Sequence, residues 1–254
     1  MRNFLLILTI VSLSFPSCRS KIKQQEDSIY SRHLQRQMAL TIITTPMPKN
    51  KEEMNLLLFN SGKGMLEAVR AKKIIDSLYK KNLIQPLTLV AFDGNQKDYG
   101  LQETGSDESN QHQKFNDFVT DELYPFTKKN VVIRKFNSVA ICGFGRSAVS
   151  AFDIAWNNDE KIQKAGMFLP EFAESSEMND SLVIETIRSS RKKPNLNIWL
   201  SDAGNFPDEL MFKEVMDGKK SVSNFSVTDD ATISNRNNAQ VNNFTDFLIW
   251  AFPK

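Results

Sequence analysis

Residues 137–156 read NSVAICGFGRSAVSAFDIAW, and this stretch decides the fold. The apolar run from Asn137 to Gly143 predicts a buried central strand. Small residues fill the stretch from Arg146 to Trp156, which predicts a helix packed closely against that strand. Gly143 and Gly145 separate the two elements, and glycine permits the sharp turn that such close packing requires.

The alternation of strands and helices continues on both sides of this stretch. We expect strands at Leu34–Thr45, Met54–Phe59, Pro86–Phe92, Ala165–Leu169, Asn195–Leu200 and Ser221–Val227. We expect helices at Leu66–Lys81, Lys114–Lys128, Glu209–Met216 and Asn242–Phe252, and a long polar loop at Asp93–Gln111. This order predicts an α/β fold with a mostly parallel central sheet and helices on both faces.

The composition is that of one globular domain. Of 254 residues, 41% are hydrophobic and 24% are charged, which is enough apolar material for a sizeable core. The formal charge is only +2, so we expect no nucleic-acid partner. His33 and His112 lie apart from each other and from both cysteines, so we expect no metal site and no cofactor.

The N-terminus has the pattern of a bacterial export signal. A basic start precedes the apolar run Phe4–Phe15, which is too short to span a bilayer comfortably. The sequence Phe15-Pro16-Ser17-Cys18 then resembles a lipobox, in which Cys18 receives a lipid. The alternative is an ordinary secretory signal cut near Ser17, with release into the periplasm.

The predicted division is a signal peptide at 1–17, a polar tether at 18–30 and a folded domain at 31–254. The expected location is the bacterial cell envelope, with the protein anchored to a membrane on the periplasmic or surface side. Cys142 is then a small buried hydrophobic residue, and it could pair with Cys18 only if Cys18 carries no lipid.

Several segments in a fixed order carry a resemblance to a known family. They are Leu58–Gly62, Pro86–Val90 followed by Asp98-Tyr99, Asp121–Phe126, Val139–Ala151 and Ile198–Asp208. Together they resemble the putative esterase family of α/β-hydrolases, which includes enterochelin-esterase-like and esterase D-like proteins. The resemblance covers roughly Ser31 to Phe252. It implies the α/β-hydrolase fold and, in intact members, a Ser-His-acid triad that hydrolyses carboxylic esters.

The segment that resembles the nucleophile elbow departs from the G-x-S-x-G pattern. In one register Gly143 is the leading glycine and Gly145 takes the position of the nucleophilic serine. In the other register Ser147 is the nucleophile, and Val149 then falls where close packing favours glycine. This packing argument favours the first register, in which the nucleophile position has no reactive side chain.

The general base is missing in either register. The order of the triad in this fold is serine, then acid, then histidine, but no histidine follows His112 in this sequence. Asp202 or Asp208 could keep the position of the acid, although without histidine it would have no triad role. We expect both histidines, His33 and His112, to be exposed and not catalytic.

The backbone of an oxyanion hole could survive these losses. Its donors would be the N–H groups of Lys63 and Arg146, and the Arg146 side chain would favour a carboxylate or phosphate, unless it is an ordinary surface arginine.

The leading hypothesis is a lipid-anchored pseudo-esterase that binds a small molecule or protein at the former active-site cleft. One alternative is an active ester hydrolase that uses Ser147, with Asp208 or a water relay assisting. Another alternative is a structural envelope lipoprotein without a ligand pocket.

Overall fold

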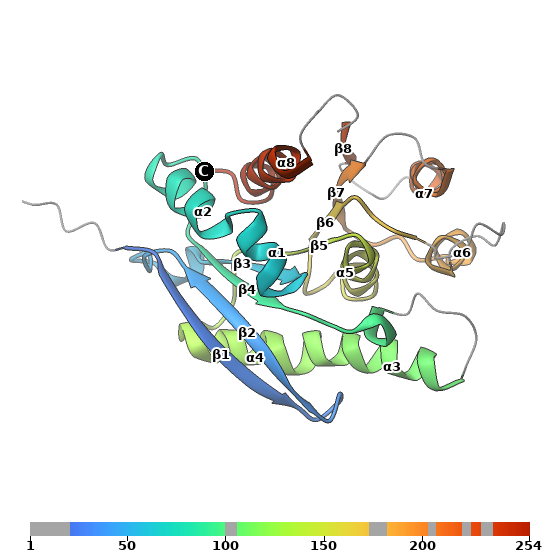
Figure 1. Ribbon diagram of the computed structural model, residues 1–254, viewed down its shortest axis with the longest axis horizontal. Coiled ribbons are helices and arrows are strands. Elements are labelled where there is room, and N and C mark those ends of the chain that lie inside the picture. The colour runs from blue at the N-terminus through green and yellow to red at the C-terminus, as the bar shows by residue number, and fades with distance from the viewer. Residues whose placement is uncertain (1–20, 100–105, 173–181, 203–206, 220–224, 230–235) are drawn as a thin grey trace, which may run out of the picture.

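The computed structural model describes residues 21–99, 106–172, 182–202, 207–219, 225–229 and 236–254. Eight strands form one sheet in the order β1-β2-β4-β3-β5-β6-β7-β8 (Figure 1). The strands are β1 (Lys23–Ser31), β2 (Arg36–Thr44), β3 (Asn55–Asn60), β4 (Leu87–Phe92), β5 (Val139–Phe144), β6 (Lys164–Phe168), β7 (Asn197–Asp202) and β8 (Phe225–Asp229). Strand β2 is antiparallel to both neighbours, and the strands from β4 to β8 run parallel. This sheet confirms the predicted fold class.

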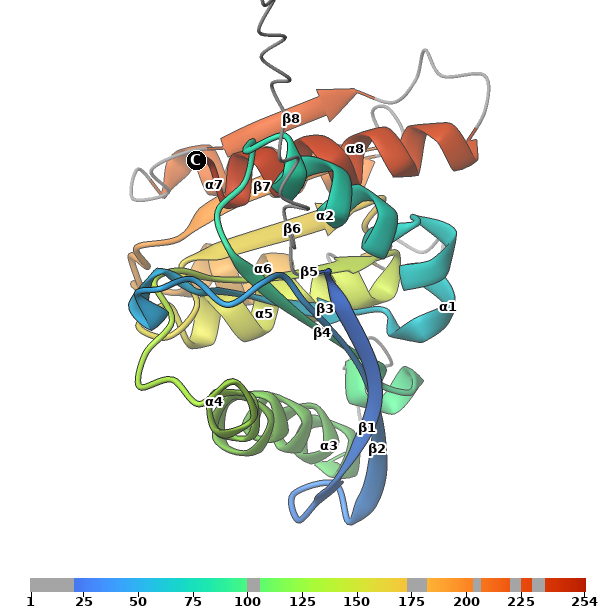
Figure 2. The same cartoon turned by 90° about the vertical axis from the view of Figure 1, so that its left-hand side faces the viewer.

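Helices cover both faces of the sheet (Figures 1 and 2). One face packs against α1 (Gly62–Ala68), α2 (Ala71–Lys80) and α8 (Arg236–Ala251). The other face packs against α3 (Ser106–Asp117), η3 (Phe118–Leu123), α4 (Tyr124–Val131), α5 (Arg146–Asn157), α6 (Leu182–Ser189) and α7 (Pro207–Gly218). Strands β3, β4 and β5 are buried along their whole length because both of their faces are covered.

The predicted polar tether at 18–30 is wrong for most of its length. Residues from Lys23 onward form β1, which pairs with β2 from Lys23 opposite Thr44 to Ser31 opposite Arg36. The strand is polar because it lies at the edge of the sheet, and four of its first five residues are exposed. The hairpin extends beside α3 and α4, and the Glu122 carboxylate accepts a hydrogen bond from the Arg32 backbone N–H at 2.9 Å (Figure 2).

Other boundaries also differ from the expectation. The helix expected at Leu66–Lys81 is two helices, separated at Arg70, which has a left-handed φ of 55°. Much of the expected loop at Asp93–Gln111 is helical, since η2 occupies Gln96–Tyr99 and α3 begins at Ser106. From there α3, the π-helix η3 and α4 run on without a break to Val131.

All eight strands and both hydrophobic clusters come from residues after position 21, so a chain that starts at Arg19 contains the whole described fold. Within the described ranges, no helix has the length and apolar character needed to cross a bilayer. The same residues contain no group of three or more His, Cys, Asp or Glu side chains arranged to hold a metal.

Candidate active-site elbow

The turn between β5 and α5 has the geometry of a nucleophile elbow. Strand β5 ends at Phe144, α5 begins at Arg146, and Gly145 between them has φ 60° and ψ −127°. A side chain is strained in this conformation, which glycine adopts readily. Gly143 is also required, because a Cβ at this position would lie 2.2 Å from the Ser147 carbonyl oxygen. The residue at the tip of the turn, in the conformation that would strain a side chain, is therefore Gly145 and not Ser147.

Ser147 lies in the first turn of α5, and its hydroxyl is already hydrogen-bonded. Its Oγ donates to the Phe144 carbonyl at 2.9 Å and accepts from the Phe144 N–H at 3.1 Å. The Ser61 Oγ, at the end of β3, lies 2.5 Å from the same oxygen. Ser147 is 5% exposed, and its hydroxyl connects the first turn of α5 to the ends of β5 and β3.

A cavity of about 490 Å³ opens at this turn. Its lining joins the ends of β3, β4, β5 and β6 to α8, where parallel α/β sheets commonly place their ligands. The lining residues are Ser61, Met65, Asp93, Tyr99, Phe144, Gly145, Arg146, Ser147, Leu169, Glu171 and Gln240. Of the site residues named from the sequence, the structure brings Gly145, Arg146 and Ser147 together here.

An ion pair lies next to the turn. The Arg146 Nε is 3.7 Å from a Glu171 carboxylate oxygen, and a Cβ built on Gly145 would lie 3.3 Å from the other oxygen of Glu171. Arg146 is mostly covered, whereas the Glu171 side chain is 65% exposed. The Lys63 side chain does not line the cavity. Its Nζ lies 3.2 Å from a carboxylate oxygen of Glu26 on β1.

The loop after β4 forms a second wall of the cavity and is fixed by hydrogen bonds. The Tyr99 hydroxyl donates to Asp93 at 2.6 Å and accepts from the Gly94 N–H at 3.0 Å. Burial and the neighbouring Asp93 carboxylate raise the pKa of Tyr99, which therefore stays protonated at neutral pH. Behind it, the fully buried Asp98 carboxylate forms an ion pair with Arg36 from β2.

The expectation that His112 is exposed in a loop is wrong. His112 lies on α3 and is mostly buried, with Nε2 2.7 Å from the Asp153 carboxylate on α5 and Nδ1 3.2 Å from the Asp98 carbonyl. Burial alone would lower its pKa, but the hydrogen bond and charge of Asp153 outweigh burial and raise it. His112 does not line the cavity at the elbow. Its contacts connect α3 to α5, which is a structural role.

Some predicted residues fall elsewhere. His33 lies half-buried in the β1–β2 turn. Cys142 is buried in β5, where burial raises the pKa of its thiol well above the ordinary value. Cys18 and the side chains of Asp202 and Asp208 lie outside the part of the chain that the structure describes.

Sequence reasoning did not assign Ser61, Glu171 or Gln240 to the site. A signal for Ser61 was present, because Ser61-Gly62 aligns with the His-Gly pair that ends the corresponding strand in the esterase family. Glu171 follows β6 by three residues without any recognisable pattern, and Gln240 is one of many polar residues before the last helix.

The strand order, the parallel sheet from β4 to β8 and the strained turn after β5 define an α/β-hydrolase fold. The chain belongs to the family described as "Putative esterase", whose model matches residues 31–240. No protein of curated function matches the chain in sequence.

Solved structures of esterases share the fold. A ferulic acid esterase superposes with a TM-score of 0.71 at 13% identity, covering 91% of this chain and 98% of its own. An enterochelin esterase from Shigella flexneri gives 0.68 at 14% identity, covering 90% of this chain but only 57% of its own. An IroE-like serine hydrolase from Shewanella oneidensis gives 0.67 at 13% identity, covering 91% of this chain and 80% of its own.

The two glycines of the elbow should respond differently to alanine. Gly145→Ala adds a side chain at a positive φ and should lower the free energy of unfolding by about 1–3 kcal/mol. Gly143→Ala should cost more, because its Cβ would meet backbone 2.2 Å away. Urea unfolding monitored by circular dichroism measures both, with Gly64→Ala, which meets no atom within 4 Å, as the control. Equal, small losses at positions 143 and 145 would contradict the described turn.

The His112–Asp153 pair should make stability depend on pH. Because the folded pKa of His112 is raised, its contribution is complete below about pH 6.5 and is lost as the pH rises through the raised value. His112→Ala should therefore cost about 1–3 kcal/mol near pH 6 and less near pH 9. Denaturant unfolding at both pH values tests this, with Gln113→Ala on the exposed side of α3 as the control. A cost that is the same at both pH values would show that the pair adds no charge interaction.

Proposed function

We propose that this protein is a lipid-anchored member of the esterase family that binds a ligand at the elbow cavity without hydrolysing it. The observation that carries the proposal is Gly145, which occupies the tip of the turn where an acyl-transfer enzyme of this fold presents its nucleophile. Glycine has no side-chain atom that could attack a carbonyl carbon.

The absence of a suitable base supports the same conclusion. No histidine follows His112 in the sequence, and His112 does not line the cavity, since its ring nitrogens contact the Asp153 carboxylate and the Asp98 carbonyl. A serine hydroxyl without a neighbouring imidazole is a weak nucleophile at neutral pH. Ser147 is also engaged by backbone groups of Phe144, so moving its proton would break contacts that hold the turn.

The cavity favours ligand binding over a purely structural envelope role. Its volume of about 490 Å³ suits a small molecule, and both apolar and polar side chains line its walls. The N–H groups at the start of α5 favour a carbonyl oxygen next to Gly145, and an anionic group would bind there by displacing the Glu171 carboxylate from Arg146. Backbone donors at Lys63 and Arg146 would complete this subsite. A protein segment that presents the same group is the alternative occupant.

The anchor in this proposal is a lipid on Cys18, which would place the domain in the bacterial envelope on the periplasmic or surface side. Cys18 precedes β1 by only five residues, so the fold would lie close to the membrane. Incorporation of labelled palmitate into the original protein but not into Cys18→Ser tests the anchor. No incorporation into the original protein would count against it.

The second candidate is an ester hydrolase that uses Ser147. The observation in its favour is that Ser147 lines the cavity, with the Ser61 hydroxyl 2.5 Å away. This reading requires the serine hydroxyl to leave its contacts with Phe144 before it attacks.

Methyl ferulate tests the two candidates together, because a ferulic acid esterase shares the fold. We expect ligand-observed NMR to detect binding and the spectrum to show no released ferulate or methanol. Gln240→Trp places an indole in the cavity and should abolish the binding, whereas Gln113→Trp at an exposed position of α3 should not. Steady hydrolysis that Ser147→Ala removes would overturn the proposal in favour of the hydrolase. Failure of methyl ferulate to bind would count against the cavity as an ester-like ligand site.

A further inference from the structure

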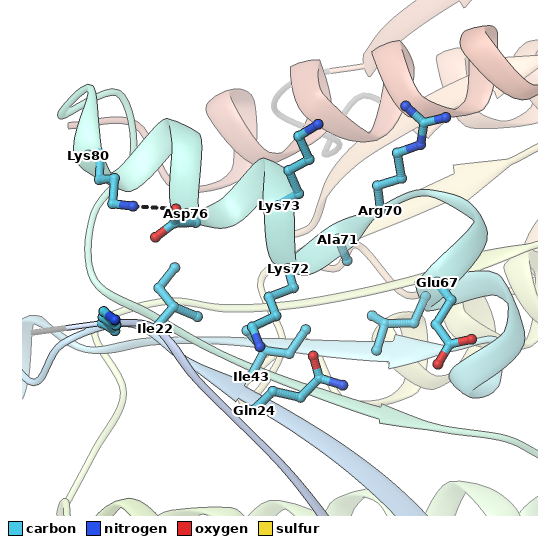
Figure 3. Close-up of a pocket in the computed structure, with 12 residues that line it drawn as sticks. Ile22, Gln24, Ile43, Glu67, Arg70, Ala71, Lys72, Lys73, Asp76 and Lys80 are labelled. Atoms are coloured by element: carbon cyan, nitrogen blue, oxygen red, sulfur yellow. Dashed lines mark hydrogen bonds and ion pairs between the residues drawn. The ribbon is translucent and has the colours of Figure 1, made fainter.

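A second groove lies away from the elbow, between the β1–β2 edge of the sheet and helices α1 and α2 (Figure 3). Its volume is about 570 Å³, and no lining residue is shared with the elbow cavity. Its apolar floor consists of Ile22, Ile43, Leu66 and Ala71. Ile43, Leu66 and Ala71 are buried, and Ile22 is the half-buried residue of the floor. The groove therefore lies on a part of the fold that the proposed ligand site does not use.

Positive charge surrounds this floor. Five basic side chains, those of Lys21, Arg70, Lys72, Lys73 and Lys80, line the groove with only two acidic ones, Glu67 and Asp76. The excess of three positive charges exceeds the formal charge of +2 on the whole chain, so the remainder is slightly acidic. The groove would thus attract an anionic surface.

Most of these cations are available to a partner. Lys80 pairs with Asp76 at 2.5 Å, but in the described part of the chain no ion pair involves Arg70, Lys72 or Lys73. All three side chains belong to exposed residues at the start of α2. Figure 3 shows Lys72 reaching over Ile43 and Gln24, while Arg70 and Lys73 point away from the strands.

The hollow continues toward the C-terminal residue. A neighbouring depression of about 380 Å³ shares Ile22, Asp76 and Lys80 and adds Pro46, Ile84 and Lys254 among its walls. Together the two hollows form an extended surface that is apolar along its floor and mainly basic along its rim.

The N-terminal segment joins the fold at this groove. Lys21 and Ile22 line it, and Cys18 lies only three residues before Lys21. We propose that the groove is a docking surface for an anionic phospholipid membrane, with its cations at the headgroup phosphates and the half-buried Ile22 against the glycerol region. The position of the groove next to the membrane rests on the proposed lipid on Cys18, whereas its affinity for anionic lipid does not.

Vesicle co-sedimentation tests this surface in a chain that starts at Arg19 and so lacks both Cys18 and the apolar N-terminal run. We expect binding to vesicles of equal parts phosphatidylglycerol and phosphatidylcholine, and much weaker binding to pure phosphatidylcholine. High salt should release the protein, because exposed charges are screened. Each cation near an anionic surface strengthens binding by about 5-fold. The double variant Lys72→Gln with Lys73→Gln should therefore bind about 25-fold more weakly.

The matched control is Lys114→Gln with Lys129→Gln, which removes the same charge from exposed residues on the opposite face of the sheet. This control should bind almost as tightly as the original chain. Equal losses in both double variants would overturn the proposal, because binding would then depend only on total charge. No preference for phosphatidylglycerol, or displacement by inorganic phosphate at constant ionic strength, would also overturn it. None of these outcomes depends on methyl ferulate or on the elbow, so they are distinct from failure of the proposed function.

Discussion

The close contact between the end of β5 and the first turn of α5 is the constraint on which the rest of the structure depends. It requires Gly143, since any Cβ there would collide with the Ser147 carbonyl, and it forces a positive φ at Gly145. Ser147 then satisfies the Phe144 backbone groups at the turn. The Asn60 side chain at the end of β3 donates to the Ser147 carbonyl and the Ser150 hydroxyl, both at 3.3 Å, and so joins the turn to the neighbouring strand.

This constraint separates the architecture of the site from its chemistry. The turn, the cavity and the N–H groups at the start of α5 depend on backbone conformation. They are therefore kept whichever residue occupies the tip, provided that this residue can adopt the conformation of the turn. Hydrolysis depends on a hydroxyl at the tip and an imidazole nearby, and either can be lost without harm to the fold. A glycine at the tip even relieves the backbone strain that a serine there would bear. Retention of the pocket with loss of the chemistry is therefore a physically coherent outcome for this fold.

The central sheet could be predicted from the sequence, but its edges and several contacts of the site could not. Strands β3, β4 and β5 are continuous apolar runs because helices cover both of their faces. Strand β1 has no such signal, since an edge strand that faces solvent keeps polar residues. The first turns of α3 are equally polar, and polarity without an apolar stripe predicts a loop there. The pairing of His112 with Asp153, and of Arg146 with Glu171, joins residues far apart in the chain, and no local pattern predicts it.

The most direct test of the central claim is intact mass spectrometry of the folded protein after incubation with a fluorophosphonate probe, which reacts with activated serines. The account predicts no mass increase, because Gly145 has nothing to phosphonylate and the Ser147 hydroxyl stays bound to Phe144. A single probe adduct that maps to Ser147 and is absent from a heat-denatured sample would contradict it. That result would mean that the elbow presents Ser147 to ligands and that the protein is a serine hydrolase.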